Sequence, residues 1–301
     1  LIVMLMMASV AFAGCVSDDG DDTDDIDDTV DPVGGETEST LDTVIARGSL
    51  KCGVKDSQYG MGYLEADGTY TGLDIEYCKA VAAAIGVDTI EYVLATGSNR
   101  FELLASEEID VLIRTTTWTT SRDADLNADF AGINFYDGQG ILVNTDAYDP
   151  VPTSALQLDG AKICVGIGTT TEGNIADYFA VNNMEYTAVN SDDAATAKSQ
   201  FEDGACYAWT GDMSAMVAQK FGLDTAKVPN SAIMPELLSK EPLAAATRDN
   251  DDDWNDVVTW VWYGMLTAEE LGITSANYGS ADLSIPANDR LLNNNLGLDT
   301  E

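Results

Sequence analysis

From residue 41 onward, short apolar strands alternate with helices, and this alternation limits the folds open to the chain. The first run places strands at 50–54, 90–94 and 110–113, with helices at 72–86 and 99–107 between them. A strand–helix–strand–helix–strand order predicts a parallel sheet with helices on its faces. We expect a short helix at 41–48 before the first strand and a loop at 56–68.

The pattern then repeats. Expected strands lie at 161–167, 186–189, 205–210 and 232–235, expected helices at 168–179, 191–204 and 213–221, and a long helix at 252–271. Segments near 135–143 and 235–243 connect the two units. Two lobes joined by two strands form a hinge, and the cleft between them is the natural ligand site. We therefore expect lobe 1 at 41–137 and 239–278, lobe 2 at 138–238, and a polar tail at 279–301.

Charge and composition exclude several classes of function. The 301 residues contain 52 Asp and Glu against 14 Lys and Arg, a net charge of −38, and no His. So acidic a chain does not neutralise phosphate, which argues against a nucleic-acid partner. The absence of His removes the commonest metal ligand and general base. The chain also lacks a G-x-x-x-x-G-K-[ST] loop, so we expect no bound ATP. We expect no cofactor and no metal site.

The first 40 residues are expected to direct and tether the protein. Residues 1–15, LIVMLMMASVAFAGC, are too short an apolar run to span a bilayer comfortably and suit a signal peptide. Ala11 to Cys15 resembles a lipobox, where Cys15 would be lipidated; the alternative is an ordinary secretory signal with an incidental Cys. Residues 16–40 contain eleven acidic residues and no basic one, which predicts a disordered tether. Residues 41–301 retain 41 acidic and 14 basic residues, a net charge of −27.

One stretch, DVLIRTTTWTTSRDADLNADFAGINFYDGQG at 110–140, concentrates groups that bind ligands. Four hydroxyl residues follow the expected strand, with Trp118 among them and Arg122 just beyond: Thr115, Thr116, Thr117 and Thr119. Ligands bind at the carboxyl ends of strands in open α/β sheets, and the Arg fork suits a carboxylate. The alternative is a Thr-rich loop with a surface Arg in a salt bridge.

The second unit offers complementary groups. The spacing of Thr169 and Glu172 suits a capping box, and a helix start such as Thr169–Thr170 also attracts anions. Asp212 follows another expected strand, although an Asp there is more often a helix N-cap. Tyr59 and Tyr63 are candidate pocket aromatics or ordinary loop packing.

Several stretches together resemble the substrate-binding proteins of amino-acid ABC importers, family 3 of the extracellular solute-binding proteins, and most closely their general L-amino-acid branch. They run from about 41 to 277 and include GLDIEYCKAVAAAI, NRFELLASEEIDVLIRTTTWTTSRD, DFAGINFYDGQGILV and MPELLSKEPLAAATR. RTTTWTTSRD beside FYDGQG is the most specific of them. The resemblance implies a two-lobed periplasmic-binding-protein-like (type II) α/β fold, with two hinge strands and each lobe a sheet flanked by helices.

The resemblance also implies residue roles. Arg122 would grip the α-carboxylate of an amino acid, and Thr115 and Thr117 would contact its ammonium or carboxylate. In lobe 2, Thr169 and Thr170 would form the carboxylate-binding helix start, and Asp212 would pair with the α-ammonium. Many relatives have an aromatic residue before the helix at 99–107 that stacks on the ligand; residues 95–98 have none, so Trp118 or Tyr59 would take that role. Arg114 is either an extra cation in the cleft or structural.

The remaining cysteines fit an exported protein. Cys52 and Cys78 fall in lobe 1, and Cys164 and Cys206 in lobe 2, so we expect the disulfides 52–78 and 164–206. Three pairings of four cysteines exist, and buried free thiols are the alternative.

The predicted function is capture of L-amino acids outside the cytoplasm, with the closed protein docking on the permease subunits of an ABC importer. We expect a monomer, anchored by lipid to the outer face of the cell membrane or periplasmic, and not an enzyme. The alternatives are a cyclohexadienyl or arogenate dehydratase on the same fold, which would need a further acid or base in the cleft, and a ligand-sensing module.

Overall fold

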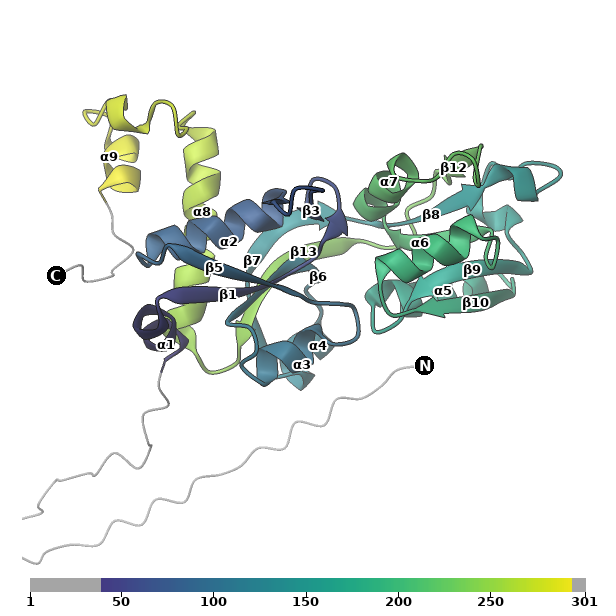
Figure 1. Cartoon of the computed structure of the whole chain (residues 1–301), viewed down its shortest axis with the longest axis horizontal. Coiled ribbons are helices and arrows are strands. Elements are labelled where there is room, and N and C mark those ends of the chain that lie inside the picture. Colours follow the sequence, from purple (N-terminus) through teal and green to yellow (C-terminus); the bar gives the residue numbers. More distant parts are fainter. Residues whose placement is uncertain (1–38, 294–301) are drawn as a thin grey trace, which may run out of the picture. The chain divides into compact units, whose positions relative to one another are not determined.

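The computed structural model describes residues 39–293. They contain two five-stranded sheets and one small three-stranded sheet. Figure 1 shows the two large sheets, each with helices packed against it. We call the sheet containing β1 and its helices lobe 1, and the sheet containing β9 and its helices lobe 2; the chain thus has a two-lobed α/β fold.

Lobe 1 begins with a capped helix and ends with the longest helix of the described chain. Its elements are α1 (Thr40–Arg47), β1 (Ser49–Val54), β2 (Ser57–Gln58), β3 (Gly62–Leu64), β4 (Tyr70–Thr71), α2 (Leu73–Ala84), β5 (Thr89–Leu94), α3 (Arg100–Ala105), β6 (Val111–Thr117), α4 (Thr120–Asp125), β7 (Ala128–Asp137), β13 (Glu241–Arg248) and α8 (Asp252–Glu270). A 3-10 turn, η3 (Tyr278–Ser280), and α9 (Pro286–Leu292) follow.

Lobe 2 lies between β7 and β13 in the sequence. Its elements are β8 (Gln139–Asn144), η1 (Thr145–Ala147), η2 (Ala155–Gln157), β9 (Ala161–Gly166), α5 (Thr170–Val181), β10 (Tyr186–Ser191), α6 (Ala194–Glu202), β11 (Ala208–Asp212), α7 (Met213–Phe221) and β12 (Ser231–Ile233). The chain crosses from β7 to β8 at Gly138 and returns from β12 to β13 through residues 234–240.

The two large sheets have the same plan. In lobe 1 the order is β5-β1-β6-β13-β7, and in lobe 2 it is β10-β9-β11-β8-β12. The first three strands of each are parallel, as the strand–helix alternation predicts. The fourth strand is antiparallel to its neighbours in both sheets, which makes the sheets mixed rather than wholly parallel. In each lobe this fourth strand adjoins a crossing, so it links the sheet directly to the hinge.

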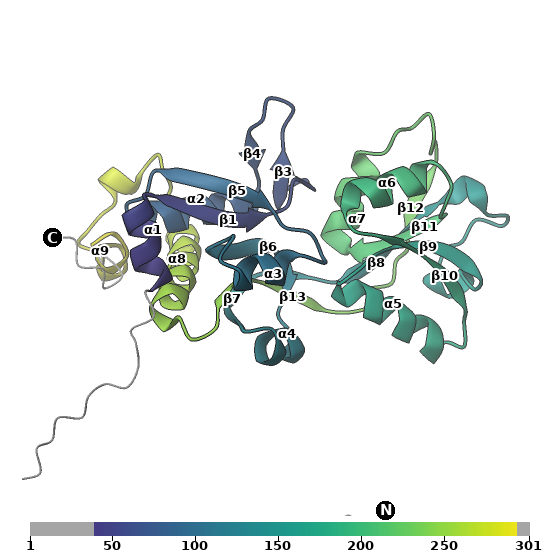
Figure 2. The same ribbon diagram turned by 60° about the horizontal axis from the view of Figure 1, so that its bottom comes forward.

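Helices cover both faces of each sheet because alternate strand residues point to opposite sides. In β6, Val111 and Ile113 pack into the core beneath α2 and α8, whereas Leu112 packs with Leu104 of α3 on the other face. Lobe 2 repeats the arrangement on the two sides of β9, with α5 on one face and α6 on the other. Figure 2 shows the helices of each lobe from a second direction.

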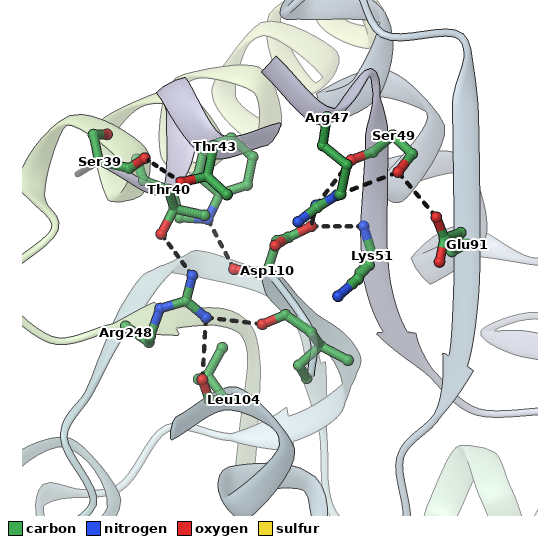
Figure 3. Close-up of polar contacts among 12 residues, drawn as sticks. Ser39, Thr40, Thr43, Arg47, Ser49, Lys51, Glu91, Leu104, Asp110 and Arg248 are labelled. Carbon is green, nitrogen blue, oxygen red and sulfur yellow. Dashed lines mark hydrogen bonds and ion pairs between the residues drawn. The ribbon is translucent and has the colours of Figure 1, made fainter. Parts of the chain in front are cut away.

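Polar contacts fix the base of lobe 1 (Figure 3). Asp110 accepts a hydrogen bond from the backbone N–H of Lys51 at 2.7 Å and pairs with the Arg47 guanidinium. Arg248, the last residue of β13, donates to the carbonyl of Leu104 at 3.1 Å and to the Thr40 hydroxyl at 2.6 Å. These contacts join α1, α3 and the end of β13, so the return strand from lobe 2 is anchored at its far end.

Each lobe contains one disulfide, and the pairing is the one the sequence predicts. Cys52 of β1 is bonded to Cys78 of α2, and Cys164 of β9 is bonded to Cys206, just before β11. Both bonds hold a central strand of the sheet to an element packed beside it. Cys15 lies outside the described residues.

Several expectations about local structure were wrong. Residues 57–71 contain the antiparallel strands β2, β3 and β4 rather than a loop, and the tail contains α9. Strand β6 does not end at residue 113 but continues to Thr117, because β13 pairs with it that far. Ser39 and Thr40 belong to the start of α1, where the Ser39 hydroxyl accepts from the N–H of Leu41 at 3.2 Å. The rest of the tether, residues 16–38, lies outside the described part of the chain.

Candidate functional site

A cavity of about 330 Å³ lies between the two lobes. Its wall comes from residues at or just after the carboxyl ends of parallel strands, which is where open α/β sheets bind ligands. Lobe 1 contributes Lys55 after β1, residues 94–97 after β5, and the end of β6. Lobe 2 contributes the loop from β9 to α5 and the end of β11.

Six of the eight residues predicted to bind a ligand line this cavity: Thr115, Thr117, Arg122, Thr169, Thr170 and Asp212. Trp118 and Tyr59 lie elsewhere. Trp118 is the first residue after β6, and its side chain packs on lobe 1 away from the cavity. Its ring stacks on Phe130 with centroids 5.5 Å apart, and its N–H donates to Asp123 at 2.7 Å. Tyr59 stacks on Tyr63 at 3.7 Å between ring centroids.

Arg122 is held by a short helix and one backbone contact. The Thr119 hydroxyl caps α4 by accepting from the N–H of Arg122. The Arg122 guanidinium donates to the carbonyl of Thr117 at 2.8 Å and lies 5.7 Å from the centroid of the Phe101 ring. Burial lowers the pKa of Arg122, which remains a cation at neutral pH. The side chain is thus nearly buried and fixed, with the rest of its donor fork directed to the cavity wall.

Thr115 has a backbone conformation that β-branched residues rarely adopt, with φ of 36°. The nearby carboxylate of Asp74, at the start of α2, accepts from the N–H of Thr115 at 3.2 Å. The Thr115 hydroxyl is buried without a hydrogen-bond partner among the described residues. Local strain and an orphaned polar atom are both more common at functional sites than in ordinary strands.

The start of α5 forms the facing wall. The Thr169 hydroxyl caps the helix by accepting from the N–H of Glu172 at 3.2 Å, and the Glu172 carboxylate accepts from the N–H of Gly168 at 2.9 Å. This confirms the capping interaction predicted from the Thr–x–x–Glu spacing. Unpaired N–H groups in the first turn of a helix, together with its dipole, favour an anion at this end.

Asp212 occupies the N-cap position of α7, but its side chain makes no cap hydrogen bond. Burial raises the pKa of Asp212 to about 6, with Asp137 and Glu241 acting in the same direction and Lys55 opposing them. The first turn of α7 is capped instead by Asp137, whose carboxylate accepts from the N–H of Ser214 at 3.3 Å. The Asp212 carboxylate is therefore free to accept hydrogen bonds from a ligand.

The cavity also contains three further cations: Arg114, which the sequence offered as an extra cation of the cleft, and Lys55 and Arg100, which the sequence analysis did not name. Arg100 and Arg114 are buried, and the Nε of each lacks a hydrogen-bond partner. Burial, helped by Arg114, lowers the pKa of Lys55 to about 7. Among residues 39–293, none of these three or Arg122 has a carboxylate oxygen within 4.0 Å.

Contacts between the lobes close the cavity on several sides. Arg100 donates to the carbonyl of Gly168 at 3.2 Å, and the Gln58 amide donates to the Ser214 hydroxyl at 2.8 Å. Gly97 approaches the lobe 2 backbone so closely that a Cβ there would lie 2.6 Å from the carbonyl oxygen of Ile167. This loop therefore meets lobe 2 through its backbone.

Comparison with known proteins identifies the family. The family model of the bacterial extracellular solute-binding proteins, family 3, matches residues 50–280. The chain belongs to this family. Among residues 39–293 of this family 3 protein, no helix is both long enough and apolar enough to cross a bilayer.

Individual relatives agree with this assignment. The glutamate/glutamine/aspartate/asparagine-binding protein BztA of Rhodobacter capsulatus is 47% identical over 81% of this chain and 71% of its own length. The general L-amino acid-binding periplasmic protein AapJ of Rhizobium johnstonii is 42% identical over 79% and 69%. A Brucella ovis ABC transporter/periplasmic binding protein, solved with glutathione bound, is 42% identical over 87% of this chain and 84% of its own, with a TM-score of 0.80.

The three extra cations of this family 3 protein had only a partial signal in the sequence. Arg114 stood out as a candidate cation beside the Thr run. Lys55 follows a strand and Arg100 begins a helix. At either position a surface cation is the ordinary interpretation. Only the meeting of several strand ends from the sheet brings them together, and that follows from the tertiary fold.

Replacing Asp212 with Asn is expected to stabilise the solute-free protein at alkaline pH. In the folded protein the pKa of Asp212 is about 6, above the ordinary 3.8, so folding favours the protonated carboxyl. The protein therefore loses stability as pH rises from about 4 through 6, where the unfolded chain ionises more readily than the folded one. Asp212→Asn should match the wild type near pH 4 and exceed its free energy of unfolding by about 1–3 kcal/mol at pH 8. Urea unfolding followed by fluorescence measures both, with exposed Asp88→Asn as the control. If Asp212→Asn gave no gain in stability at pH 8, the idea that ionised Asp212 destabilises the fold would be wrong.

Proposed function

We propose that this protein captures L-α-amino acids in the cavity and delivers them to the permease of an ABC importer. The observation that carries the proposal is that one cavity lined by both lobes contains a buried donor fork, Arg122, and a carboxylate that makes no hydrogen bond to its own helix, Asp212. A zwitterion needs a donor for its carboxylate and an acceptor for its ammonium, and charge-assisted hydrogen bonds are the strong kind. Because the two groups belong to different lobes, an amino acid would hold the lobes together.

Each end of the amino acid has a candidate set of partners. The α-carboxylate would contact Arg122 and the unpaired N–H groups at the start of α5, next to Thr169 and Thr170. The α-ammonium would contact Asp212 and oxygen acceptors on β6 at Thr115 and Thr117. Ligand contacts made only when the lobes meet shift the hinge equilibrium towards the closed form.

The relatives support binding and transport rather than catalysis. BztA, AapJ and a further relative 42% identical, the putative amino-acid ABC transporter-binding protein YhdW of Escherichia coli, are all named as binding proteins. Lys55 is an additional titratable group in the cavity, but its Nζ donates to the amide oxygen of Gln58 at 2.6 Å. No observation favours the dehydratase alternative.

The unpaired cations favour ligands that carry a second carboxylate. A neutral amino acid would satisfy Arg122 and Asp212 and bring no net charge to Lys55, Arg100 and Arg114. Lys55 and Arg100 donate hydrogen bonds to Gln58 and Gly168, but none of the three groups has a carboxylate oxygen within 4.0 Å among residues 39–293. Buried charge is costly without a countercharge, so an acidic side chain that reaches these groups would reduce an existing penalty. BztA is named for glutamate and aspartate and equally for their amides glutamine and asparagine, so the preference for an acidic ligand rests on the cations of the cavity alone.

The site of action follows from the family, which is extracellular, and from the periplasmic designation of AapJ. Attachment through a lipid on Cys15 and a monomeric state are proposals from the sequence alone, and Cys15 lies outside the described residues. A lipid anchor with a polar tether would keep the binding protein near its permease.

Amino acids should raise the melting temperature of the wild-type protein in a thermal-shift screen of the twenty amino acids. Arg122→Ala should weaken the best ligand about 100-fold or more, because two charge-assisted hydrogen bonds are lost together. Isothermal titration calorimetry measures the loss, with exposed Arg290→Ala as the control. If no amino acid stabilised the protein, or if Arg122→Ala bound undiminished, amino-acid capture through Arg122 would be wrong.

Arg114→Gln should change the preference for glutamate over glutamine more than it changes the affinity for amino acids as a class. Glutamate should bind the wild type more tightly than glutamine, and the substitution should cost glutamate about tenfold or more, because the amide keeps a donor but not the positive charge. Glutamine should lose less than about threefold. Equal losses for both ligands would show that Arg114 supports the fold rather than a second carboxylate.

Cys15 should carry lipid when the chain is exported in a bacterial host. Intact mass spectrometry of detergent-extracted protein should show a diacylglycerol-sized increment on Cys15, and Cys15→Ser should release the protein into the soluble fraction. An unmodified cysteine in the mature protein would support an ordinary secretory signal instead.

A further inference from the structure

Glu241 is a buried acid at the point where the two lobe crossings meet. It is the first residue of β13, directly after the return from lobe 2, and only 1% of its surface is exposed. In the sheet it pairs with Asp137, the last residue of β7 before the outward crossing. Its side chain therefore lies at the base of the hinge, beside the cavity and not among the residues that line it.

Four side chains donate hydrogen bonds to the Glu241 carboxylate. One oxygen accepts from the Thr117 hydroxyl at 2.5 Å and from the Thr170 hydroxyl at 2.9 Å. The other accepts from the amide of Asn174 at 2.8 Å and from the hydroxyl of Ser239. A carboxylate has about four lone-pair sites, so these contacts saturate it.

These contacts determine which way two cavity hydroxyls point. A hydroxyl has one proton and two lone pairs, and Thr117 and Thr170 each give their proton to Glu241. Their oxygens lie 3.4 Å apart and both line the cavity. They therefore present acceptors to a ligand, which suits an ammonium and disfavours a carboxylate.

The same contacts join the lobes. Thr117 belongs to β6 of lobe 1, whereas Thr170 and Asn174 belong to α5 of lobe 2. One buried carboxylate at the hinge thus binds both the strand that carries Thr117 and the helix whose start faces the cavity. Opening of the cleft at this point would separate donors from a buried charge, which is costly.

We propose that Glu241 is a positioning residue with two linked effects: it orients the hydroxyls of Thr117 and Thr170 as acceptors for the ligand ammonium, and it holds α5 against β6 in the closed state. The effect on the threonine hydroxyls rests on the proposed amino-acid binding. The effect on the contact between α5 and β6 does not.

The test compares Glu241→Gln with Glu236→Gln. Glu236 lies on the same return segment, but its carboxylate accepts only within lobe 2, from the N–H of Ala155 at 2.9 Å and from the Ser154 hydroxyl. In Glu241→Gln one acceptor oxygen is replaced by an NH2 group, so the four donors can no longer all be satisfied. When the NH2 group takes the place of the oxygen that Thr117 and Thr170 share, both threonines must accept from it and turn their protons towards the cavity. Calorimetry then measures binding of L-glutamate and of the matching α-hydroxy acid, 2-hydroxyglutarate, which lacks the ammonium.

Glu241→Gln is expected to weaken glutamate about tenfold or more and to reduce the preference for glutamate over 2-hydroxyglutarate by a similar factor, whereas Glu236→Gln should change both by less than about twofold. A residue that merely supports the fold would lower both affinities equally. An unchanged preference in Glu241→Gln would therefore overturn the first effect.

Small-angle X-ray scattering of the ligand-free proteins tests the second effect without any ligand. Glu241→Gln should increase the radius of gyration relative to the wild type and Glu236→Gln; equal values would overturn the role in closure. If the wild type binds no amino acid, the proposed function fails, and this arm alone still decides the role in closure. If Glu241→Gln does not fold, Thr170→Val should reproduce both changes and Thr170→Ser, which keeps the hydroxyl, should not.

Discussion

Buried charge without a partner is the constraint on which the rest of this structure depends. Arg114 and Arg100 have buried nitrogens that lack hydrogen-bond partners, and burial raises the pKa of Asp212 to about 6. Such groups destabilise a folded protein, so they persist where something else compensates them. A charged solute supplies that compensation. An empty closed cleft therefore carries an electrostatic cost, which the contacts of Glu241 with β6 and α5 offset in part. A zwitterion with suitable charges converts the same charged groups into binding energy.

The repeated topology explains how one cavity collects these charges. In both sheets the parallel strands end at the same edge, and the fourth, antiparallel strand adjoins the crossing between lobes. Residues far apart in the sequence, such as Lys55 after β1 in lobe 1 and Asp212 at the end of β11 in lobe 2, consequently line one cavity. Each disulfide joins an inner strand to another segment of the same lobe, so each wall is cross-linked within its own lobe.

The sequence could predict those parts that depend on local pattern. Periodicity located most helices and strands, and the Thr-rich run after an apolar strand pointed to Arg122 and the threonines that now line the cavity. It did not locate the hairpins of residues 57–71, because these short strands pair only with each other and lack an apolar face. It also could not place Trp118, whose ring stacks on Phe130 outside the cavity because of a contact that only the tertiary fold creates. Glu241 had no signal, because its role depends on two threonines 124 and 71 residues away.

Closure of the cleft combines two kinds of contact that respond differently to a ligand. The backbone approach of Gly97 to Ile167 and the bond from Arg100 to Gly168 need no ligand and only require that the lobes meet. The contacts of Arg122 and Asp212 with a zwitterion exist only when it is present. A ligand shifts the equilibrium only by its differential affinity for the two forms. Because Glu241 already links β6 to α5, part of the ordering needed for closure is built into the hinge, and the ligand has correspondingly less to contribute.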